Sequence, residues 1–471
     1  MPGADYDVIV IGGGGGGMSA ALVAAATGAR VLLVEAGSRC GGATALSGGA
    51  FYAAGTRVQQ AAGIEGDSAE AMYTYGMALN RYRMEPSVFR RFCEETGGAL
   101  HWLIDLGVQF PPAGLTLADV SGVPRSHWAV GRGAAIAETL EGHLQSAGVE
   151  VVTNTRVRKL TVESGAVTGI EVEGETIHAN AVVVASGGFG ANDELLAKHY
   201  PAAAEVEGSW YIGPETSQGD SLAFGSAVGA ALTGENRGLQ LMSPGLHPTL
   251  EMPPGWLVFV NKHGLRFMNE SVPYCVFNPI FEAQPDRMAF AIFDRAAFEN
   301  PPKDPRFAAA QAAGTSSTDW KTDILAAGLK AGRILEGNTL EDLAARAGIR
   351  PGALTETVAR YNEGAEAGED RLFFKGAQHL VPIGAGPYYA ATMTMQIVCF
   401  TSYGLRIDRE ARVQDLSGKP IPGLYAAGEA SGGLMGEVYL GSGNSIANAV
   451  TFGRIAGTNA GRYARSNFAG A

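Results

Sequence analysis

Three glycines near the N-terminus have the spacing with which a protein chain binds the pyrophosphate of a dinucleotide. Gly12, Gly14 and Gly17 follow an apolar stretch, residues 7–11, and open a run of small residues typical of a helix. In this G-x-G-x-x-G pattern the first glycine permits a tight turn and the second lets the pyrophosphate approach the backbone. The third lets the helix pack closely on the strand. The free N–H groups of the helix start then face the negative charge.

An acidic residue lies where such a cofactor needs one. Residues 30–34 predict a second apolar strand, which ends at Glu35. A carboxylate about 20 residues after the glycines is where a ribose hydroxyl finds its acceptor. Because strand, glycines, helix, strand and acid occur together, residues 1–36 predict a dinucleotide-binding βαβ unit rather than a flexible glycine-rich linker.

Further glycine-rich segments predict loops that lie against the same cofactor. They are residues 41–49, the end of an apolar strand at 181–188, residues 423–429, and residues 441–449, which open a helix that reaches about Arg465. A glycine-rich helix start suits an electron-rich oxygen. The residues expected to bind the cofactor are Gly12, Gly14, Gly17, Glu35, Ala43, Thr44, Ser47, Gly48, Gly49, Val157, Ala185, Ser186, Gly187, Gly428, Glu429, Gly443, Ser445 and Ile446.

The segments between these loops divide by their apolar patterns. Residues 68–106 predict helices, with a start at Glu85-Pro86. Residues 120–132 predict a loop before a helix over 133–147, and Arg125, His127 and Trp128 in it are candidates for facing a substrate. A loop histidine without a partner is more often structural. Short strands at 149–153, 160–163, 167–173 and 176–179 predict a β-meander.

The pattern changes around residues 235–400. Residues 256–260 and 265–269 predict a hairpin, and residues 340–347 and 351–364 predict helices. We therefore expect three stretches: 1–234 and 403–471 forming the cofactor-binding domain, and 235–402 forming a second domain inserted into it. A chain of 471 residues is long enough for two cores.

Composition excludes several classes of partner. The formal net charge of −12 argues against nucleic acid and anionic membrane surfaces. No apolar stretch approaches the ~20 residues that span a bilayer, and the N-terminus has no signal-peptide pattern. The four cysteines, Cys40, Cys93, Cys275 and Cys399, are far apart and suit reduced thiols of a cytoplasmic protein without a metal site.

Taken together, the chain resembles the flavoprotein family of fumarate reductase, succinate dehydrogenase and the 3-ketosteroid dehydrogenases over nearly its whole length. Besides the N-terminal fingerprint, the matching segments are residues 47–49, 185–188, 264–270, 427–429, 443–449 and 452–454. The resemblance implies an α/β fold: a Rossmann-like FAD-binding domain with an inserted α+β capping domain that carries catalytic residues. It implies FAD, bound non-covalently, because residues 40–49 lack the histidine of the family's covalent members.

The fumarate reductases resemble one another in two segments that this chain lacks. One is a His-Thr-x-Gly-Gly segment, where this chain has CFTSYG at 399–404. The other is an arginine before the final Gly-Asn-Ser, where this chain has GEVYLG at 436–441. His247, in residues 247–249, keeps a trace of the older pattern. A dicarboxylate site needs a cluster of cations, which these segments do not supply.

The ketosteroid dehydrogenase branch is more similar, at residues 435–443 (MGEVYLGSG) and 269–274 (NESVPY). This resemblance implies that the Tyr439 hydroxyl and the Gly443 N–H bind a ketone oxygen and that Tyr274 is the base. The Cα proton beside a ketone is weakly acidic unless donors stabilise the developing enolate. A tyrosinate-like base then removes the proton, and the Cβ hydride passes to flavin N5. Arg266 and Glu270 are expected to form a structural pair.

The expected function is FAD-dependent α,β-dehydrogenation of a small apolar cyclic ketone, first of all a 3-ketosteroid. A smaller cyclohexanone-type ketone is an alternative, because the chain is short for the steroid branch. A reductase of an unsaturated carboxylate is a second alternative. A non-catalytic electron-transfer flavoprotein is a third, and it leaves Tyr274 and Tyr439 without a purpose. The electron acceptor stays open.

Overall fold

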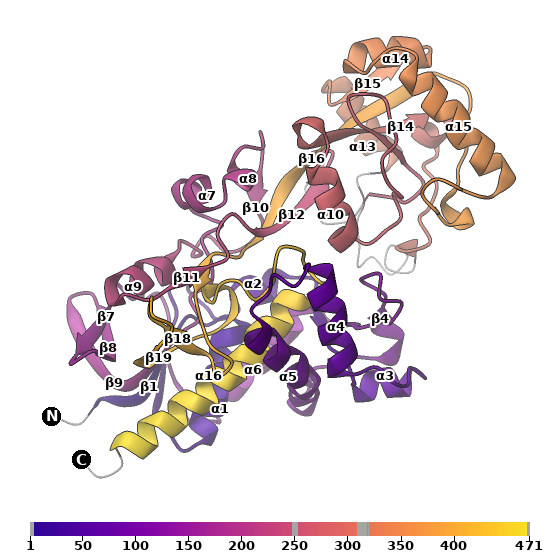
Figure 1. Cartoon of the computed structure of the whole chain (residues 1–471). Coiled ribbons are helices and arrows are strands. Elements are labelled where there is room, and N and C mark those ends of the chain that lie inside the picture. Colours follow the sequence, from indigo (N-terminus) through magenta and orange to yellow (C-terminus); the bar gives the residue numbers. More distant parts are fainter. Residues whose placement is uncertain (1–3, 247–252, 309–317, 319, 469–471) are drawn as a thin grey trace. The chain divides into compact units, whose positions relative to one another are not determined.

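The computed structural model of the chain describes residues 4–246, 253–308, 318 and 320–468 (Figure 1). The chain forms two compact units. Unit 1 comprises Met1–Glu205, Tyr211–Leu239 and Cys399–Ala471, and unit 2 comprises Val206–Trp210 and Gln240–Val398. Unit 2 is thus inserted into the sequence of unit 1. The expected fold class, a Rossmann-like α/β domain with an inserted α+β part, is confirmed.

A largely parallel sheet forms the centre of unit 1. Its strand order is β18-β19-β9-β1-β2-β6, and only β18 runs antiparallel to its neighbour. β1 and β2 are buried over most of their length, as expected for apolar strands covered on both faces. The strands are β1 (Tyr6–Ile11), β2 (Val31–Val34), β6 (Glu150–Val152), β9 (Glu175–Val184), β18 (Arg412–Gln414) and β19 (Pro420–Ala426).

Two helices from opposite ends of the chain lie side by side in unit 1 (Figure 1). They are α1 (Gly15–Ala26) and α16 (Asn444–Phe468). A Cβ atom added at Gly453 would collide with the carbonyl oxygen of Gly16, and one at Gly457 with that of Ala20. The helices approach this closely because neither glycine carries a side chain. The start of α16 is thereby brought to the glycine-rich turn that precedes α1.

The other elements of unit 1 surround this framework. β3, β5 and β4 form a small antiparallel sheet, and β7, β8 and β9 form a meander. Glu85 caps α5 by accepting a hydrogen bond from the Ser87 N–H, with Pro86 as the first helical residue. The elements are α2 (Gly42–Leu46), β3 (Ala50–Tyr52), α3 (Arg57–Ala61), α4 (Ala69–Leu79), α5 (Pro86–Asp105), η1 (Pro112–Gly114), β4 (Leu115–Thr116), β5 (Ser126–Trp128), α6 (Arg132–Leu144), β7 (Lys159–Glu163), β8 (Ala166–Val172), α7 (Asp193–His199), α8 (Pro201–Ala204), α9 (Asp220–Val228), β11 (Leu232–Thr233), β17 (Gly404–Leu405) and η4 (Gly428–Ala430).

Two local predictions for unit 1 were wrong. The strand expected over 149–153 does not join the meander, because β6 pairs with β2 at the edge of the parallel sheet. The stretch over 120–132 is not entirely a loop, because β5 forms within it and pairs with both β3 and β4. Both errors have one cause: pairing partners distant in sequence decide which sheet a short apolar segment joins.

Unit 2 is built on a sheet with the order β10-β16-β14-β13, in which β12 and β15 also pair with β16. Alternate residues of β14 face opposite ways. Ala289, Ala291 and Phe293 belong to the hydrophobic cluster that includes residues of α10, whereas Phe290 and Ile292 belong to the cluster with α14 and α15. The elements are β10 (Trp210–Tyr211), β12 (Gly238–Ser243), β13 (Val258–Val260), α10 (Tyr274–Glu282), η2 (Pro285–Arg287), β14 (Met288–Asp294), α11 (Arg295–Glu299), α13 (Thr322–Lys330), β15 (Ile334–Gly337), α14 (Leu340–Ala347), α15 (Ala353–Ala367), η3 (Ala377–His379) and β16 (Tyr388–Thr401).

In unit 2, the prediction of a hairpin over 256–269 was wrong. Only β13 is a strand there, and the following segment meets it through one isolated bridge between Val260 and Arg266. The side chains of Arg266 and Glu270 instead belong to a buried charge network. In a regular second strand these two side chains would not meet in this way.

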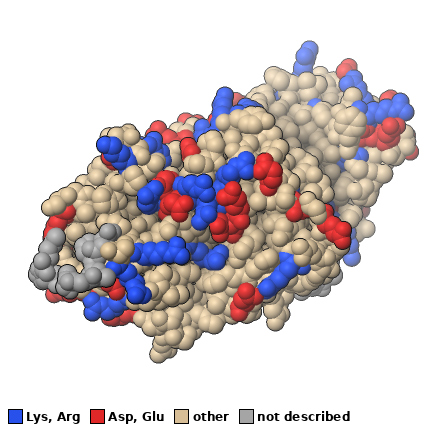
Figure 2. Space-filling model, turned by 60° about the horizontal axis from the view of Figure 1, so that its bottom comes forward, with Lys and Arg blue, Asp and Glu red and all other residues tan. Residues whose placement is uncertain are grey.

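Three global expectations can be compared with the described part of the chain. No described helix is both long and apolar enough to cross a membrane. The four cysteines form no disulfide, and no group of described histidines, cysteines and acids could hold a metal ion. Figure 2 shows basic and acidic side chains interspersed on the face that it draws, so that face carries no extended basic patch.

Candidate functional site

The three fingerprint glycines differ in what surrounds them. Gly12 has a positive φ of 101°, and a Cβ there would collide with the carbonyl oxygen of Ala185 at the end of β9. A Cβ at Gly17 would collide with the carbonyl oxygen of Gly12. A Cβ at Gly14 would meet nothing within 4 Å. Gly12 and Gly17 are therefore required by the fold itself, whereas Gly14 faces open space that suits an approaching pyrophosphate.

Glu35 anchors the loops on either side of it. Its Oε2 accepts a hydrogen bond of 2.6 Å from the Gly13 N–H, and its Oε1 accepts one of 2.6 Å from the Gly37 N–H. Glu35 is buried, with a relative exposure of 8 %. Each carboxylate oxygen has two lone pairs, so both keep acceptor capacity for ribose hydroxyls. The Thr155 N–H donates to the Glu35 carbonyl oxygen at 2.9 Å. Val157, two residues further along the chain, is buried.

The second glycine-rich loop is tied to the first. The Gly15 N–H donates to Thr44 Oγ1 at 3.2 Å, and the Gly41 N–H donates to the Gly13 carbonyl oxygen at 2.8 Å. Ser47 Oγ donates to the Thr44 carbonyl oxygen at 2.7 Å. The structure thus brings Gly41 and Thr44 of this loop against the fingerprint turn. Ala43 and Ser47 lie in the same loop, whereas Gly48 lies beside Trp128 and Gly49 beside Arg132.

The ends of β9 and β19 complete this group of loops. Ala185 follows β9, and its N–H donates to the Ile11 carbonyl oxygen at 2.8 Å. A Cβ at Gly188 would collide with the carboxylate of Glu429, and Gly187 and Gly428 have positive φ values of 76° and 67°. The carboxyl ends of parallel strands are where open α/β sheets bind their ligands.

Glu429 is a carboxylate with an unusual environment. Its Oε1 accepts hydrogen bonds of 2.8 Å from both the N–H and the hydroxyl of Thr401. Removal from water raises the pKa of Glu429 to about 7, although the Thr401 donors oppose the shift. This side chain therefore changes its charge near neutral pH.

Several buried polar atoms around these loops have no partner within the described residues. Ser186 Oγ follows β9, and Asn444 Oδ1 and Asn448 Oδ1 lie in the first turns of α16. Buried polar groups are normally hydrogen-bonded, so a polar ligand is expected at these positions. These three polar atoms, the open space at Gly14 and the Glu35 carboxylate fit FAD. Ile446 is buried in the first turn of α16.

Tyr439 lies just before α16 and is held by its first turn. The Ser445 N–H donates to the Tyr439 hydroxyl oxygen at 2.8 Å, and the hydroxyl also pairs with Ser445 Oγ at 2.9 Å. Burial raises the pKa of Tyr439 to about 12, so the phenol stays protonated near neutral pH. A protonated phenol keeps one O–H that can donate a hydrogen bond. The ring lies 6.1 Å from that of Phe400, between centroids.

Gly443 occupies a position that only glycine can take. Its φ is 98°, and a Cβ would lie 2.6 Å from the carbonyl carbon of Ala50 and 2.6 Å from the N atom of Phe51. The turn is therefore pressed against β3. No hydrogen bond among the described residues uses the Gly443 N–H. One loop thus carries both a protonated phenol, Tyr439, and the Gly443 N–H.

Tyr274 belongs to unit 2. It is the first residue of α10, after Pro273 as the helix N-cap, and it packs in part against the hydrophobic cluster that contains Phe277 and Phe281. The loop with Tyr439 and Gly443 belongs to unit 1.

The three substrate-facing candidates near residue 127 have structural partners. Arg125 is buried and forms an ion pair of 2.7 Å with Asp67. His127 Nε2 pairs with Thr56 Oγ1 at 2.8 Å, its Nδ1 pairs with backbone carbonyl oxygens, and burial lowers its pKa to about 4. Trp128 Nε1 donates to Thr116 Oγ1 at 2.9 Å. His127 is therefore a neutral structural histidine.

Two groups near the Tyr439 loop were not expected from the sequence. The Tyr52 hydroxyl, fully buried on β3, donates to Asp119. Glu437 forms ion pairs with two arginines. Arg237 Nη2 lies 2.9 Å and Arg83 Nη1 3.1 Å from its Oε1. Residues 83, 237 and 437 are too far apart in sequence for any local pattern to join them. His247 lies outside the described residues.

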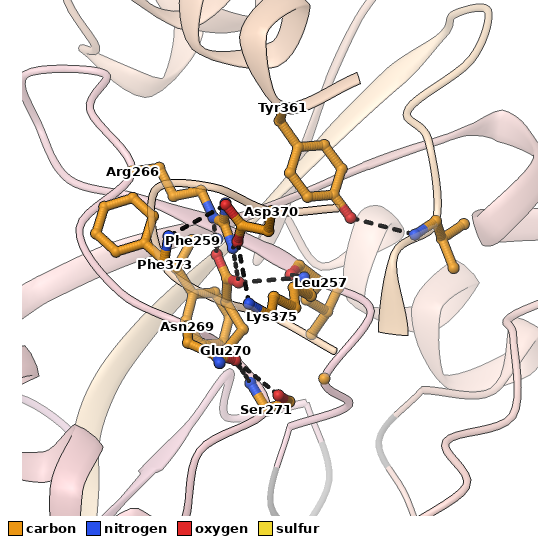
Figure 3. A network of polar contacts seen from close by, with 12 residues as sticks. Leu257, Phe259, Arg266, Asn269, Glu270, Ser271, Tyr361, Asp370, Phe373 and Lys375 are labelled. Carbon is orange, nitrogen blue, oxygen red and sulfur yellow. Dashed lines mark hydrogen bonds and ion pairs between the residues drawn. The ribbon is translucent and has the colours of Figure 1, made fainter. Parts of the chain in front are cut away.

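The pair expected between Arg266 and Glu270 is confirmed as part of a larger network in unit 2 (Figure 3). Arg266 Nε donates to Glu270 Oε1 at 2.8 Å, and Arg266 Nη2 lies 2.7 Å from Asp370 Oδ2. Lys375 Nζ lies 3.1 Å from Glu270 Oε2 and donates to the Leu257 carbonyl oxygen at 2.7 Å. Although burial would raise the pKa of Glu270, Lys375 and Arg266 hold it below its ordinary value.

Comparisons with known proteins agree with this geometry. The sequence model of a family described as "FAD binding domain" matches residues 7–446. A probable fumarate reductase of Shewanella frigidimarina is 31 % identical, over 98 % of this chain and 76 % of its own. A 3-oxosteroid 1-dehydrogenase of Mycobacterium tuberculosis is 28 % identical, over 96 % of this chain and 97 % of its own. The solved structure of a 3-ketosteroid-Δ4-(5α)-dehydrogenase from Rhodococcus jostii RHA1 has a TM-score of 0.79 and 28 % identity, over 98 % of both chains.

Proposed function

Because this chain belongs to the FAD-binding family of flavoprotein oxidoreductases, which includes fumarate reductases and 3-oxosteroid dehydrogenases, we propose that it desaturates the Cα–Cβ bond beside the ketone of a cyclic substrate. The first substrate class is a 3-ketosteroid. A smaller cyclohexanone-type ketone is the alternative within the same chemistry. As an FAD-dependent oxidoreductase, the protein takes the flavin as its hydride acceptor.

The observation that carries this proposal is the character of the Tyr439 loop. The loop offers a protonated phenol and the Gly443 N–H, and its residues 435–443 contain neither lysine nor arginine. Neutral donors suit an oxygen that is uncharged in the substrate and becomes negative only as the enolate forms. A dicarboxylate is charged from the start and calls for cations.

In this mechanism the chain's residues divide the work on the substrate. The Tyr439 hydroxyl and the Gly443 N–H bind the ketone oxygen and stabilise the charge that develops on it. Tyr274, at the start of α10, takes the proton from Cα. Glu35 and the glycine-rich loops of unit 1 hold the cofactor in place.

The relatives in both branches leave reduction of an unsaturated carboxylate as the competing function. A specific observation speaks for keeping it in the test: Arg83 and Arg237 both lie at Glu437, two residues before Tyr439. Glu437 neutralises the two arginines in part, which weakens their attraction for a substrate carboxylate.

Anaerobic mixing separates the two functions. We expect a panel of saturated cyclic ketones, steroidal and smaller, to bleach the flavin absorbance, and Tyr274→Phe to abolish the bleaching while a non-reacting ketone still binds. If no ketone bleaches the flavin and fumarate or another unsaturated carboxylate reoxidises the reduced flavin, the ketone proposal is wrong. Normal flavin reduction in Tyr274→Phe would remove Tyr274 as the base.

The proposed flavin linkage is non-covalent. Residues 40–49, which enclose the second glycine-rich loop, contain no histidine. Acid denaturation should release all the yellow colour into the supernatant, and colour retained in the protein pellet would contradict the proposal.

A further inference from the structure

The turn that carries Gly443 is held from one side by two residues that face each other in a small sheet. Tyr52 of β3 and Ser126 of β5 are directly paired in the antiparallel register. Ser126 Oγ donates to the Ser442 carbonyl oxygen at 2.9 Å, and the Tyr52 N–H donates to the Gly443 carbonyl oxygen at 3.2 Å. One pair of strand residues thus binds two consecutive carbonyl groups of the turn.

The Ser126 hydrogen bond determines where the next N–H points. The peptide bond between Ser442 and Gly443 is trans, and in a trans peptide the C=O and the following N–H point in opposite directions. Because the Ser442 carbonyl oxygen is directed at β5, the Gly443 N–H is directed away from it. That N–H is the group without an acceptor among the described residues.

The Ser126 hydroxyl is a buried donor. Ser126 is fully buried, and its hydroxyl supplies a hydrogen-bond donor that alanine lacks. Gly443 is already pressed against Ala50 and Phe51, which keeps the turn close to the sheet but leaves rotation of this one peptide to be restrained. A carbonyl held at 2.9 Å supplies that restraint.

We propose that Ser126 is a positioning residue that aims the Gly443 N–H at the substrate's ketone oxygen. The inference rests on the proposed function. Ser126 touches no substrate in this scheme; it acts through the Ser442–Gly443 peptide. Without it the peptide rotates, and the donor loses its alignment with the oxygen on which the enolate charge develops.

The test uses a stable mimic of the enolate. 4-Nitrophenolate presents a full negative charge on an oxygen, and nitrobenzene presents the same ring without it. In holoenzyme carrying Ser126→Ala we expect 4-nitrophenolate to bind at least about tenfold more weakly, with nitrobenzene affinity changed by less than about twofold. The turnover number should fall by at least about tenfold with little change in KM for the ketone.

Three further variants make the result specific. Ser126→Thr keeps a hydroxyl at the same position and should restore phenolate binding. Ser221→Ala removes another buried hydroxyl from unit 1, in α9, and should leave both ligands unaffected. Tyr439→Phe removes the other proposed donor and should weaken phenolate binding on its own.

The outcomes separate this inference from the proposed function. Weaker phenolate binding in both Ser126→Ala and Tyr439→Phe supports both. An effect in Tyr439→Phe alone overturns the role of Ser126 and leaves the function standing. No effect in either variant overturns both. Equal losses for nitrophenolate and nitrobenzene in Ser126→Ala would mean that Ser126 only shapes the pocket, which also overturns the inference.

Discussion

The two units each bury a set of polar groups, and the two sets are built differently. In unit 2, Arg266, Glu270, Asp370 and Lys375 place two cations against two carboxylates, and every charge has a partner (Figure 3). In unit 1, the loop around Tyr439 presents a neutral phenol and a backbone N–H. A closed set of charges stabilises a fold, whereas the role we propose for the neutral donors is to bind an oxygen that becomes charged only during the reaction.

The aromatic surroundings of the charged set support its structural role. The Arg266 guanidinium lies 4.9 Å from the ring centre of Phe373 and 5.2 Å from that of Tyr361. Glu270 Oε1 also accepts a hydrogen bond of 3.1 Å from the Phe259 N–H on β13. The network therefore joins β13 to the segment around Asp370 and Lys375.

The largest effect is expected when one charge is removed from the buried network of Arg266, Glu270, Asp370 and Lys375 in unit 2. Lys375→Met leaves Glu270 and Asp370 with a single cation in a buried place, and the free energy of unfolding should fall by about 3–5 kcal/mol. Urea unfolding measures it. Arg371→Met removes the exposed ion pair with Glu369 and should change stability by less than about 1 kcal/mol. Equal effects of the two substitutions would contradict the structural role.

The next effect concerns turnover and not stability. Tyr439→Phe removes a donor that is needed mostly when the enolate forms, so flavin reduction should slow by ~10²–10³. Ketone binding should change less, because the ring still packs. Stopped-flow flavin absorbance measures both. Tyr425→Phe, a change at another buried tyrosine of unit 1, is the matched control and should react at the normal rate. An unimpaired Tyr439→Phe would remove the phenol from the site.

Replacing Glu35 should weaken the binding of the cofactor. Glu35→Ala removes acceptors for Gly13, Gly37 and the ribose, and charge-assisted bonds of this kind are worth ~1.5–3 kcal/mol. FAD affinity, from titration of the flavin-free protein, should fall at least about tenfold. Glu163→Ala, at an exposed position of β7, is the control. Unchanged affinity in Glu35→Ala would show that this carboxylate does not bind the cofactor.

Glu429 should make stability depend on pH near neutrality. Its folded pKa of about 7 lies above the ordinary 4.5, so the folded protein binds the extra proton. The contribution is fully present below the ordinary pKa and is lost as the pH rises through about 7, by at most about 1.4 kcal/mol per pH unit. Urea unfolding between about pH 5 and pH 8 measures this slope, and Glu429→Gln should flatten it. Identical slopes would contradict the raised pKa.

The smallest effect is expected from a substitution that makes the Tyr439 loop more favourable for a carboxylate, as in the fumarate reductase branch. Glu437→Gln removes the carboxylate that neutralises Arg83 and Arg237, both partly exposed to solvent. Stability should change by less than about 1 kcal/mol. Inhibition of ketone oxidation by fumarate should strengthen, by a few-fold or about 1 kcal/mol. Arg83→Gln combined with Glu437→Gln should reverse part of the gain. No change in fumarate inhibition would show that these arginines do not meet the substrate.

Features that depend on neighbouring residues could be predicted from the order of amino acids. The spacing of Gly12, Gly14 and Gly17 predicts the turn between β1 and α1, and the structure supplies the reason for Gly12 and Gly17 in carbonyl groups that would collide with a Cβ. Pro86 marks the first residue of α5, and the predicted bounds of α14, residues 340–347, agree with the structure. Turn geometry and helix starts are decided within a few residues, so local spacing suffices.

Contacts between residues that are distant in sequence could be identified only in the folded chain. β6 joined the parallel sheet and not the meander, and His127 proved to be a neutral histidine held by Thr56. Ser126 reached Ser442, and Lys375 completed the charges of Glu270. Such contacts join positions between 71 and 316 residues apart in sequence, and their free energy depends on burial and mutual orientation. Neither quantity exists before the strands have paired, so no spacing in the sequence encodes them.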